Sequence, residues 1–432
     1  MNDTENEYGG IKMMQNTLGL NWRFFWNNKG YSNTSISHNL TKFDWNWRLT
    51  QTEAELFNND SDEQEFRLRN VNYYRINPSH KLEFGLEAKF LKAEYDYSHQ
   101  PYNDLLGNPT DEFLMAKTVH SQKYGLFAST TWKPFGQLSL TPGVRMDHFA
   151  YNGNTHFSPR FSFSYQLNSR TSLNGAAGIF YQNLPSFLLY QKAAFKGLQD
   201  PKSRHYVLGI HHLLTENTRL TVEVYDKKYD HFPINPTQPS LFIIDQPLYQ
   251  LIRFTPHDQL VDGGKAYSRG VEVMVQKKLA EKFYGMVGGS YFRSRYQGLD
   301  GVWRNRIYDN RYTSNIEVGY KPNHKWEFSA RWTYAGGVPY TPYDVNASRA
   351  LRRGVYDRTN INSKRLPAYN CLNLRFDRRF HFSGSNLIFY FSVLNVLDRT
   401  NVWHYQWYEM SNEPITTAQF ERSPIFGLEF EF

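Results

Sequence analysis

Two stretches in the second half of the chain combine aromatic rings with arginines. One spans residues 297–310 and the other residues 336–365. Tyrosine and tryptophan supply flat stacking surfaces and arginine supplies a rigid hydrogen-bonding fork, which together suit a sugar or a chelated metal. Alternatively, the arginines pair with phosphate groups or with carboxylates of neighbouring loops. The candidate ligand contacts are Trp303, Arg304, Arg306, Tyr340, Tyr343, Arg352 and Arg353.

The sequence offers no convincing catalytic or metal-binding constellation. His211 and His212 lie beside an expected turn and have no serine motif to activate as a nucleophile. The fourteen histidines are scattered without metal-ligand spacing. A charged row that includes Lys81, Glu83, Glu87 and Lys89 is better explained as charges that line water or dock another domain. We therefore expect no enzyme activity, no cofactor and no metal site.

The composition excludes several classes of protein. Among 432 residues, 40% are apolar and the mean hydropathy is −0.65, yet 17% are aromatic. No apolar run approaches the ~18 residues that a membrane helix needs. The formal charge of +8 has no dense basic block, so we expect no nucleic-acid partner. Cys371 is the only cysteine, which excludes a disulfide framework.

The elements that position these residues read as strands with one apolar and one charged face. In the last nine residues, Phe426, Leu428, Phe430 and Phe432 alternate with glycine and glutamates. Side chains alternate across a strand, so the rings share one face. The same alternation recurs along the chain, with aromatic residues at the ends of the apolar faces. This pattern favours an all-β fold, a transmembrane antiparallel β-barrel wall. A soluble glycan-binding β-protein is the alternative, and it would bury the Phe426–Phe432 face in protein.

The turn residues divide the chain into about seventeen strands. Every second connection is short, and the others are mostly long, as in outer-membrane barrels with periplasmic turns and external loops. We expect the long connections at 51–63, 98–114, 182–202, 230–265, 297–310, 336–365 and 399–422, without helices. The strands are expected at 16–26, 31–50, 64–76, 80–97, 115–133, 137–150, 156–167, 170–181, 203–213, 217–229, 266–279, 282–296, 311–321, 325–335, 366–381, 386–398 and 423–432.

An odd number of strands has consequences for the edges of the sheet. The connection before the last strand is long, so the C-terminus is expected in the periplasm and residue 16 at the external side. Strands 16–26 and 423–432 then run in the same direction. They either remain as open edges, with unpaired backbone groups that are costly in lipid, or close the sheet through a parallel pairing. We expect near-closure, with Leu18–Phe24 facing Phe426–Phe432.

Several stretches resemble the β-barrel of TonB-dependent outer-membrane receptors. They include Leu140–Asp147, Ser158–Tyr165, Gly178–Gln182, Ser268–Glu272, Arg365–Tyr369, Val393–Asp398 and the final aromatic strand. The resemblance covers nearly all of residues 1–432. It implies one barrel domain that corresponds to the last seventeen strands of an incomplete 22-stranded receptor barrel.

The resemblance also implies a function, a location and partners. Such receptors take up a nutrient (glycan, siderophore, haem or cobalamin) across the outer membrane of Gram-negative bacteria. Nothing in the sequence resembles a secretory signal, the plug domain or the motif that engages the energy-transducing TonB-type complex. We therefore expect a receptor fragment that is not transport-competent alone. Its expected partners are outer-membrane lipid and lipopolysaccharide, the missing plug and the TonB-type complex. An outer-membrane adhesin or structural barrel without transport remains the alternative.

Overall fold

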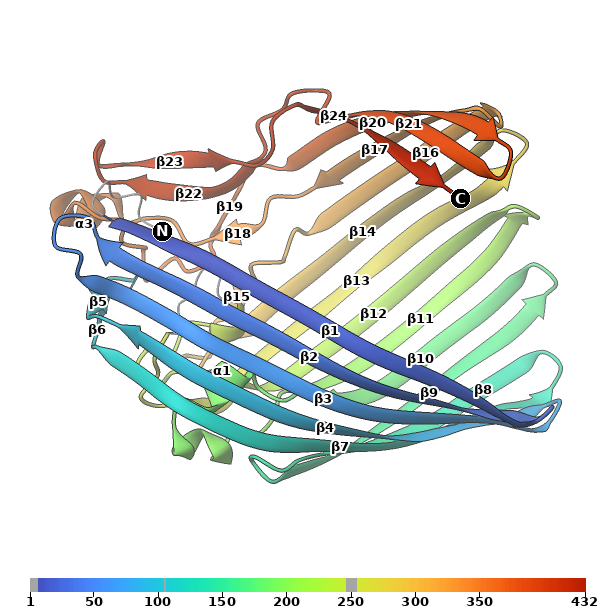
Figure 1. The fold of residues 1–432 in the computed structure, drawn as a ribbon, viewed down its shortest axis with the longest axis horizontal. Helices are drawn as coiled ribbons and strands as arrows, with labels where there is room; N and C mark the ends of the chain where they lie inside the picture. Colours follow the sequence, from blue (N-terminus) through green and yellow to red (C-terminus); the bar gives the residue numbers. More distant parts are fainter. Residues whose placement is uncertain (1–6, 105, 246–254) are drawn as a thin grey trace.

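The computed structural model describes residues 7–104, 106–245 and 255–432, which form a curved antiparallel wall around a lumen (Figure 1). The main sheet has eighteen strands. Seventeen are long and each pairs with its neighbours in sequence, as predicted; the other, β15 (Trp303–Asn305), is a short addition to β14. The long strands are β1 (Glu7–Asn27), β2 (Gly30–Leu49), β3 (Glu55–Asn77), β4 (His80–His99), β7 (Phe113–Phe135), β8 (Leu138–Phe149), β9 (Asn154–Asn168), β10 (Thr171–Tyr181), β11 (Lys202–Thr215), β12 (Thr218–Ile234), β13 (Val261–Ala280), β14 (Phe283–Gln297), β16 (Tyr312–Asn323), β17 (Trp326–Ala335), β20 (Tyr369–Phe382), β21 (Ser385–Leu394) and β24 (Ser423–Glu431).

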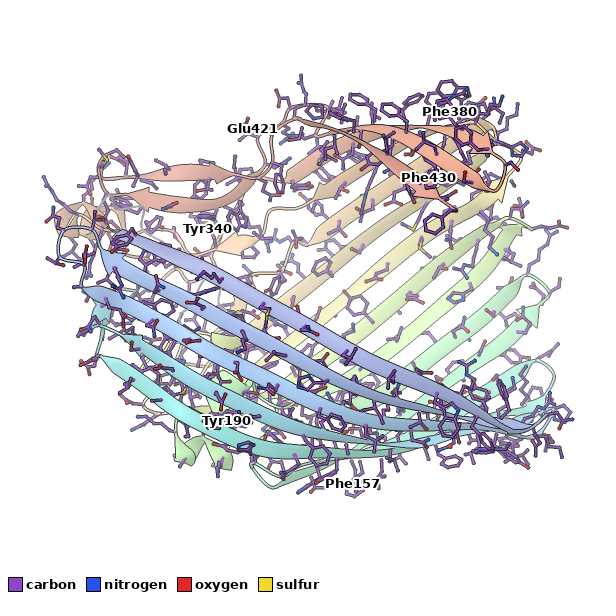
Figure 2. The ribbon with its side chains drawn as sticks, in the orientation of Figure 1. Phe157, Tyr190, Tyr340, Phe380, Glu421 and Phe430 are labelled. Carbon is purple, nitrogen blue, oxygen red and sulfur yellow. The ribbon has the colours of Figure 1, made fainter. Side chains whose placement is uncertain are left out.

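The two faces of the wall differ in chemistry because the strands alternate apolar and polar residues. On β11, Tyr206, Leu208 and Ile210 are exposed on the outer face. On β4, the outer Leu86 and Phe90 are exposed, whereas the inner Glu87 is buried among other charged side chains. Figure 2 shows Phe157 and Phe380 projecting away from the wall. An apolar outer face and a charged inner face confirm the barrel-type alternation predicted from the sequence.

The connections alternate in length, with the short turns at one end of the wall (Figure 1). One predicted long loop, 51–63, is wrong, because β3 already begins at Glu55 and leaves only residues 50–54 as the connection from β2. Asn59 and Ser61 face the lumen and are buried there, while Asp60 and Asp62 lie on the outer face. Both faces of the strand are polar at this height, so the apolar alternation that marks a strand is missing.

The long connections contain short helices, which corrects the prediction that they would contain none. The Asp344 side chain caps α3 by accepting a hydrogen bond of 2.9 Å from the Ala347 N–H. None of the described helices is long and apolar enough to cross a bilayer. The helices are α1 (Ser186–Leu189), η1 (Ala193–Gly197), η2 (Ile243–Asp245) and α3 (Val345–Leu351), and the small hairpins are β5–β6 (Tyr102–Asn103, Pro109–Thr110), β18–β19 (Pro339–Tyr340, Lys364–Arg365) and β22–β23 (Val402–Tyr408, Glu413–Ala418).

The first and last strands do not pair with each other in the described part of the chain. β1 pairs only with β2, and β24 pairs only with β21, so both are edges of the sheet (Figure 1). The expected near-closure across Leu18–Phe24 and Phe426–Phe432 is therefore wrong. The two strands run in the same direction, so closure would interrupt an otherwise antiparallel ladder. β1 is also far longer than β24, with 21 residues against nine.

Candidate functional site

The connection between β10 and β11, residues 182–201, packs against the inner face of the wall. Leu188, Leu189 and Tyr190 are almost completely buried, with Tyr190 only 1% exposed. The Tyr190 ring lies 4.5 Å from the ring of Tyr151, and its hydroxyl is 3.0 Å from the Ser121 hydroxyl. Together with inward aromatic residues of β2–β4, these side chains form the largest hydrophobic core of the protein's described part. The core fixes this connection inside the lumen.

A cavity of about 660 Å³ lies between this connection and the wall. Its sides come from β3, β4, β7, β8, β9 and residues 181–187. The lining combines cations, carboxylates, amides and rings, so it suits a polar ligand better than an apolar one. The residues that carry this chemistry are Glu63, Glu87, Lys89, Lys123, Arg145, Asp147, Phe149, Asn154, His156, Tyr181, Gln182 and Asn183.

Inward charges around Glu87 form one network along the wall of the cavity. Arg67 Nε lies 2.8 Å from Glu87 Oε1, and Arg145 Nη2 lies 3.5 Å from Glu87 Oε2. Arg145 also holds Asp147 through a contact of 2.6 Å. Gly125 makes room for this pair, since a Cβ there would lie 2.4 Å from Arg145 Nη2. The network confirms the interpretation of the Glu87 row as lumenal charge.

A buried carboxylate organises the other side of the cavity. Asp200 is 1% exposed and its Oδ2 lies 2.8 Å from His156 Nε2. The same oxygen accepts a hydrogen bond of 2.9 Å from Asn183 Nδ2. The His156 ring stacks on Tyr181 with 4.1 Å between centroids. Asp200 therefore orients His156 at the cavity wall and ties residues 182–201 to β9.

Two lysines near this connection are held by rings rather than by carboxylates. Lys123 Nζ lies 4.3 Å from the centre of the Phe149 ring, and Lys196 Nζ lies 4.4 Å from the centre of the Tyr151 ring. Neither makes an ion pair with any described residue. Cation–π contacts position an ammonium group without neutralising it. Lys123, which lines the cavity, thus presents a positive charge that an anionic ligand can use.

The predicted contacts in residues 297–310 lie elsewhere, and their arginines are engaged within the protein. Arg304 makes an ion pair of 2.6 Å with Asp300. Arg306 forms a two-pronged pair with the buried Asp245, at 2.6 and 2.8 Å. Burial opposes the charge of Arg306, but the hydrogen bonds to Asp245 outweigh it and raise the pKa of that guanidinium. Trp303 is partly exposed against Tyr267, with 5.0 Å between ring centroids.

The second predicted group lies on the neighbouring connection, residues 336–368. Tyr343 is packed between the rings of Tyr356 and Trp407, and Tyr340 contacts Tyr405 at 5.1 Å. Arg352 ends α3 in the left-handed conformation, with φ of 51°, and Arg353 follows it; neither makes an ion pair with a described residue. Paired hydrogen bonds between Asn305 and Asn362 join the two connections. None of the seven predicted residues lines the 660 Å³ cavity.

The cavity residues were missed because most of them lie on strands rather than in aromatic loops. Residues 182–202 were interpreted as an ordinary loop, although Leu188, Leu189 and Tyr190 form an apolar run unusual for a solvated loop. That run was the available signal for burial. The pairing of Asp200 with His156 depends on the register of β9, β10 and β11, which the sequence pattern does not specify.

Several long connections interlock at the end of the wall that lacks the short turns. Arg358 Nε donates a hydrogen bond of 2.7 Å to the Leu106 carbonyl. Gln238 Nε2 donates to Asp104 Oδ2 at 3.0 Å. Arg365 pairs with Asp309, whose carboxylate is completely buried. These contacts link segments that follow β4, β12, β14 and β17, so the connections restrict that end of the lumen as one unit.

His257 gives the interlocked connections a dependence on pH. Its Nδ1 lies 3.2 Å from Asn235 Nδ2, and its backbone N–H donates to Gln191 Oε1 at 3.0 Å. Burial lowers the pKa of His257 to about 4, although Asp258 acts in the opposite direction. The ring is therefore neutral when packed, but has an ordinary pKa of about 6.5 when released.

We expect residues 255–260, which surround His257, to loosen as the pH falls from about 6.5 towards 4. Between these pH values His257 binds a proton when it is released but not when it is packed. The free energy that holds His257 in its packed position is therefore largest above pH ~6.5. It falls by up to about 3 kcal/mol as the pH decreases to about 4. Hydrogen exchange of residues 255–260 across this range tests the prediction. His257→Gln should abolish most of the pH dependence; an unchanged slope in that variant would exclude His257 as its source.

Comparison with protein families identifies one match, to a family described as "TonB dependent receptor-like, beta-barrel", over residues 2–396. No curated protein sequence matches the chain. The match covers most of the described wall, from β1 to β21.

Solved structures with the same fold include three receptors. The pyoverdine-bound FpvA of P. aeruginosa has 13% identity and a TM-score of 0.67, with 96% of this chain and 56% of that chain covered. The ferric-catecholate import receptor Fiu of E. coli K12 has 11% identity and a TM-score of 0.67, with coverage of 99% and 65%. The siderophore receptor PiuA of Acinetobacter baumannii has 12% identity and a TM-score of 0.69, with coverage of 100% and 66%. The chain therefore spans about 56–66% of the length of these proteins.

Proposed function

Because the chain belongs to the TonB-dependent receptor β-barrel family, we propose that it forms the barrel wall of an outer-membrane receptor for energised uptake of a nutrient. The observation that carries this proposal is the inward-packed connection 182–201, which builds a polar cavity of about 660 Å³ against a charged wall. A purely structural barrel has no need to organise a cavity with His156, Asp200 and Lys123. The family consists of transporters rather than enzymes.

The proposed orientation places the short turns and the C-terminus in the periplasm. The long, interlocked connections then face the outside, where a nutrient arrives. Outer-membrane barrels have short periplasmic and long external connections, which supports this orientation. Lipid and lipopolysaccharide surround the outer face in this arrangement.

Energised uptake requires partners beyond this wall. We propose that a plug domain docks on the inner charges, such as the Arg67–Glu87 pair, and that a TonB-type complex supplies the energy. The wall alone binds ligand but does not transport it. FpvA is bound to a pyoverdine with iron, Fiu is a ferric-catecholate import receptor and PiuA is a siderophore receptor. For this chain, iron chelates are therefore a substrate class to test.

The cavity favours a small anionic ligand, such as a metal chelate, over a neutral glycan. Lys123 offers a positive charge without an ion-pair partner among the described residues, and His156 offers a ring nitrogen beside it in the same lining. Haem, cobalamin and glycans remain within the class of nutrients that such receptors take up. An anionic ligand gains more binding free energy from a lysine that has no carboxylate partner, because its charge is not already neutralised.

The test measures ligand binding by the purified chain in detergent, with tyrosine and tryptophan fluorescence as the signal. Ferric citrate and a ferric catecholate are the anionic probes, and a neutral oligosaccharide is the comparison. Lys123→Gln should weaken binding of the anionic probe by about tenfold, near 1.4 kcal/mol. Lys133→Gln, near the C-terminal end of β7 and outside the cavity lining, is the matched control and should leave binding unchanged. Equal binding by both variants and the parent chain would contradict the assignment of the cavity.

A further inference from the structure

His156 holds one ring nitrogen against a buried carboxylate and leaves the other open to the cavity. Its Nε2 lies 2.8 Å from Asp200 Oδ2. Its Nδ1 makes no hydrogen bond with a described residue, and it is not a buried atom. Only His156 of this pair belongs to the cavity lining. Nδ1 is therefore the nitrogen that a ligand in the cavity can reach.

The contacts of His156 determine which nitrogen carries the proton. A carboxylate only accepts hydrogen bonds, so Nε2 donates its N–H to Asp200 and Nδ1 keeps a free lone pair in the neutral ring. Asn183 Nδ2 holds the same Asp200 oxygen at 2.9 Å, and the Tyr181 ring lies parallel to the imidazole within 5°. Metal-binding histidines in proteins have this arrangement, because a carboxylate behind the ring fixes its orientation and raises its basicity.

The charge of Asp200 has no lysine or arginine partner. The side chain is 1% exposed, and within the described part of the chain His156 is the only basic residue at ion-pair distance from it. A buried carboxylate without a cationic partner is costly. A metal ion bound to Nδ1 places a positive charge on the far side of the imidazole and offsets this cost through the ring.

The cavity does not supply a complete set of ligands for a bare metal ion. Among the described residues, no group of three or more histidine, cysteine, aspartate or glutamate side chains is arranged to hold one. Lys123 adds a positive charge to the same lining and repels a free cation. A metal ion that binds here must therefore arrive with its own anionic chelator, whose negative charge Lys123 attracts. A cavity of about 660 Å³ has room for a small chelate.

We propose that His156 binds directly to the metal ion of a small anionic chelate whose coordination shell is incomplete. The inference rests on the proposed function and narrows its substrate class to chelates that carry an exchangeable water on the metal. Nδ1 replaces that water, which returns to solvent, and no other bond of the chelate changes. Lys123 contacts the carboxylates of the chelator. A chelate whose own donors fill the shell lacks the bond to His156 and depends on Lys123 alone.

The test compares the binding of two copper(II) chelates to the purified full chain in detergent. Nitrilotriacetate leaves a position on copper open to water, whereas EDTA fills the shell and gives a more negative complex. Charge alone therefore favours the EDTA complex, and coordination by His156 favours the nitrilotriacetate complex. We expect the nitrilotriacetate complex to bind about tenfold more tightly. Electron spin-echo spectroscopy of the parent chain should also detect a copper-bound imidazole, so the proposal stays testable if a variant does not fold.

Three variants assign the imidazole signal to its residue. His156→Gln should remove both the signal and the preference for the nitrilotriacetate complex. His211→Gln is the matched control and should change neither, because His211 also lies beside a carboxylate on the lumenal face but does not line the cavity. Asp200→Asn tests the positioning role of the carboxylate. It should weaken binding of the nitrilotriacetate complex by about tenfold and shift the signal of the imidazole nitrogen that faces residue 200.

Tighter binding of the EDTA complex, or an imidazole signal that survives in His156→Gln, would overturn the inference. These results differ from a failure of the proposed function. If Lys123→Gln weakens binding of both chelates equally and no imidazole signal appears, the cavity binds anionic chelates but His156 is not a metal ligand. If neither chelate binds to the parent chain, the anionic-ligand site itself is wrong.

Discussion

Replacing Arg365 with alanine is expected to cost about 3–5 kcal/mol of stability in the interlocked connections, because it leaves a buried charge unpaired. Asp309 has no exposed surface, and Arg365 is its ion-pair partner. The Asp309 carboxylate also accepts a hydrogen bond of 2.6 Å from the Ser294 backbone, which cannot balance the full charge. Arg365 further donates to the Gly337 carbonyl at 3.0 Å, so its loss releases connection 336–368 as well.

Guanidinium denaturation and hydrogen exchange of residues 298–311 and 336–368 measure this effect. Arg365→Lys keeps the charge but loses the fork, so an intermediate loss is expected. Arg353→Ala is the control, because Arg353 makes no ion pair with a described residue, and it should change stability by only about 0.5 kcal/mol. A loss below about 1 kcal/mol for Arg365→Ala would show that the Asp309 carboxylate is not held as described.

The sequence predicted the wall well because the alternation of residues has a direct physical cause. Strands such as β4 and β11 meet lipid on one side and water on the other, so their pattern of period two survives along the whole membrane span. The turns were predictable for a similar reason, as in Pro322-Asn323-His324 and Ser383-Gly384-Ser385. The count of seventeen long strands follows from these two signals.

The period-two pattern did not predict the structure of the segments outside the membrane-spanning part of the wall. Residues 58–63 form part of β3 although all six are polar, and Asn59 is buried opposite the core residues Trp45 and Tyr97 on the neighbouring strands. The inward packing of Tyr190 depends on Tyr95, Tyr151 and Ser121, which are distant in sequence. Such contacts depend on the register of the strands and on the path of the connections. The local alternation of residues in the sequence does not specify either of these.

The arginines in the long connections show that an aromatic and basic segment is compatible with two roles, contact with a ligand or ion pairing within the protein. Arg306 has the residue type of a ligand contact, but it lies against Asp245 and beside the Phe242 ring, at 5.3 Å. Its partner is more than sixty positions away in sequence, so the sequence left both interpretations open. Trp303, whose ring packs on Tyr267, and Tyr340 remain candidate ligand contacts in the long connections, separate from the cavity near Lys123.

The central claim is that the wall faces lipid on one side and a water-filled lumen on the other, and two neighbouring positions on β11 test it. Ile210 is exposed on the outer face, midway along the apolar stretch between Tyr206 and Leu214. His211 faces the lumen, with its Nε2 3.6 Å from Glu223 Oε1. An arginine is costly near the middle of a bilayer but well placed beside a carboxylate in water.

The direct measurement is the free energy of unfolding from phospholipid vesicles, obtained by guanidinium titration of the full chain and of two variants. Ile210→Arg should lose about 2–4 kcal/mol, whereas His211→Arg should lose less than about 1 kcal/mol because its guanidinium can pair with Glu223. Equal losses at the two positions, or a larger loss for His211→Arg, would contradict the assignment of the two faces.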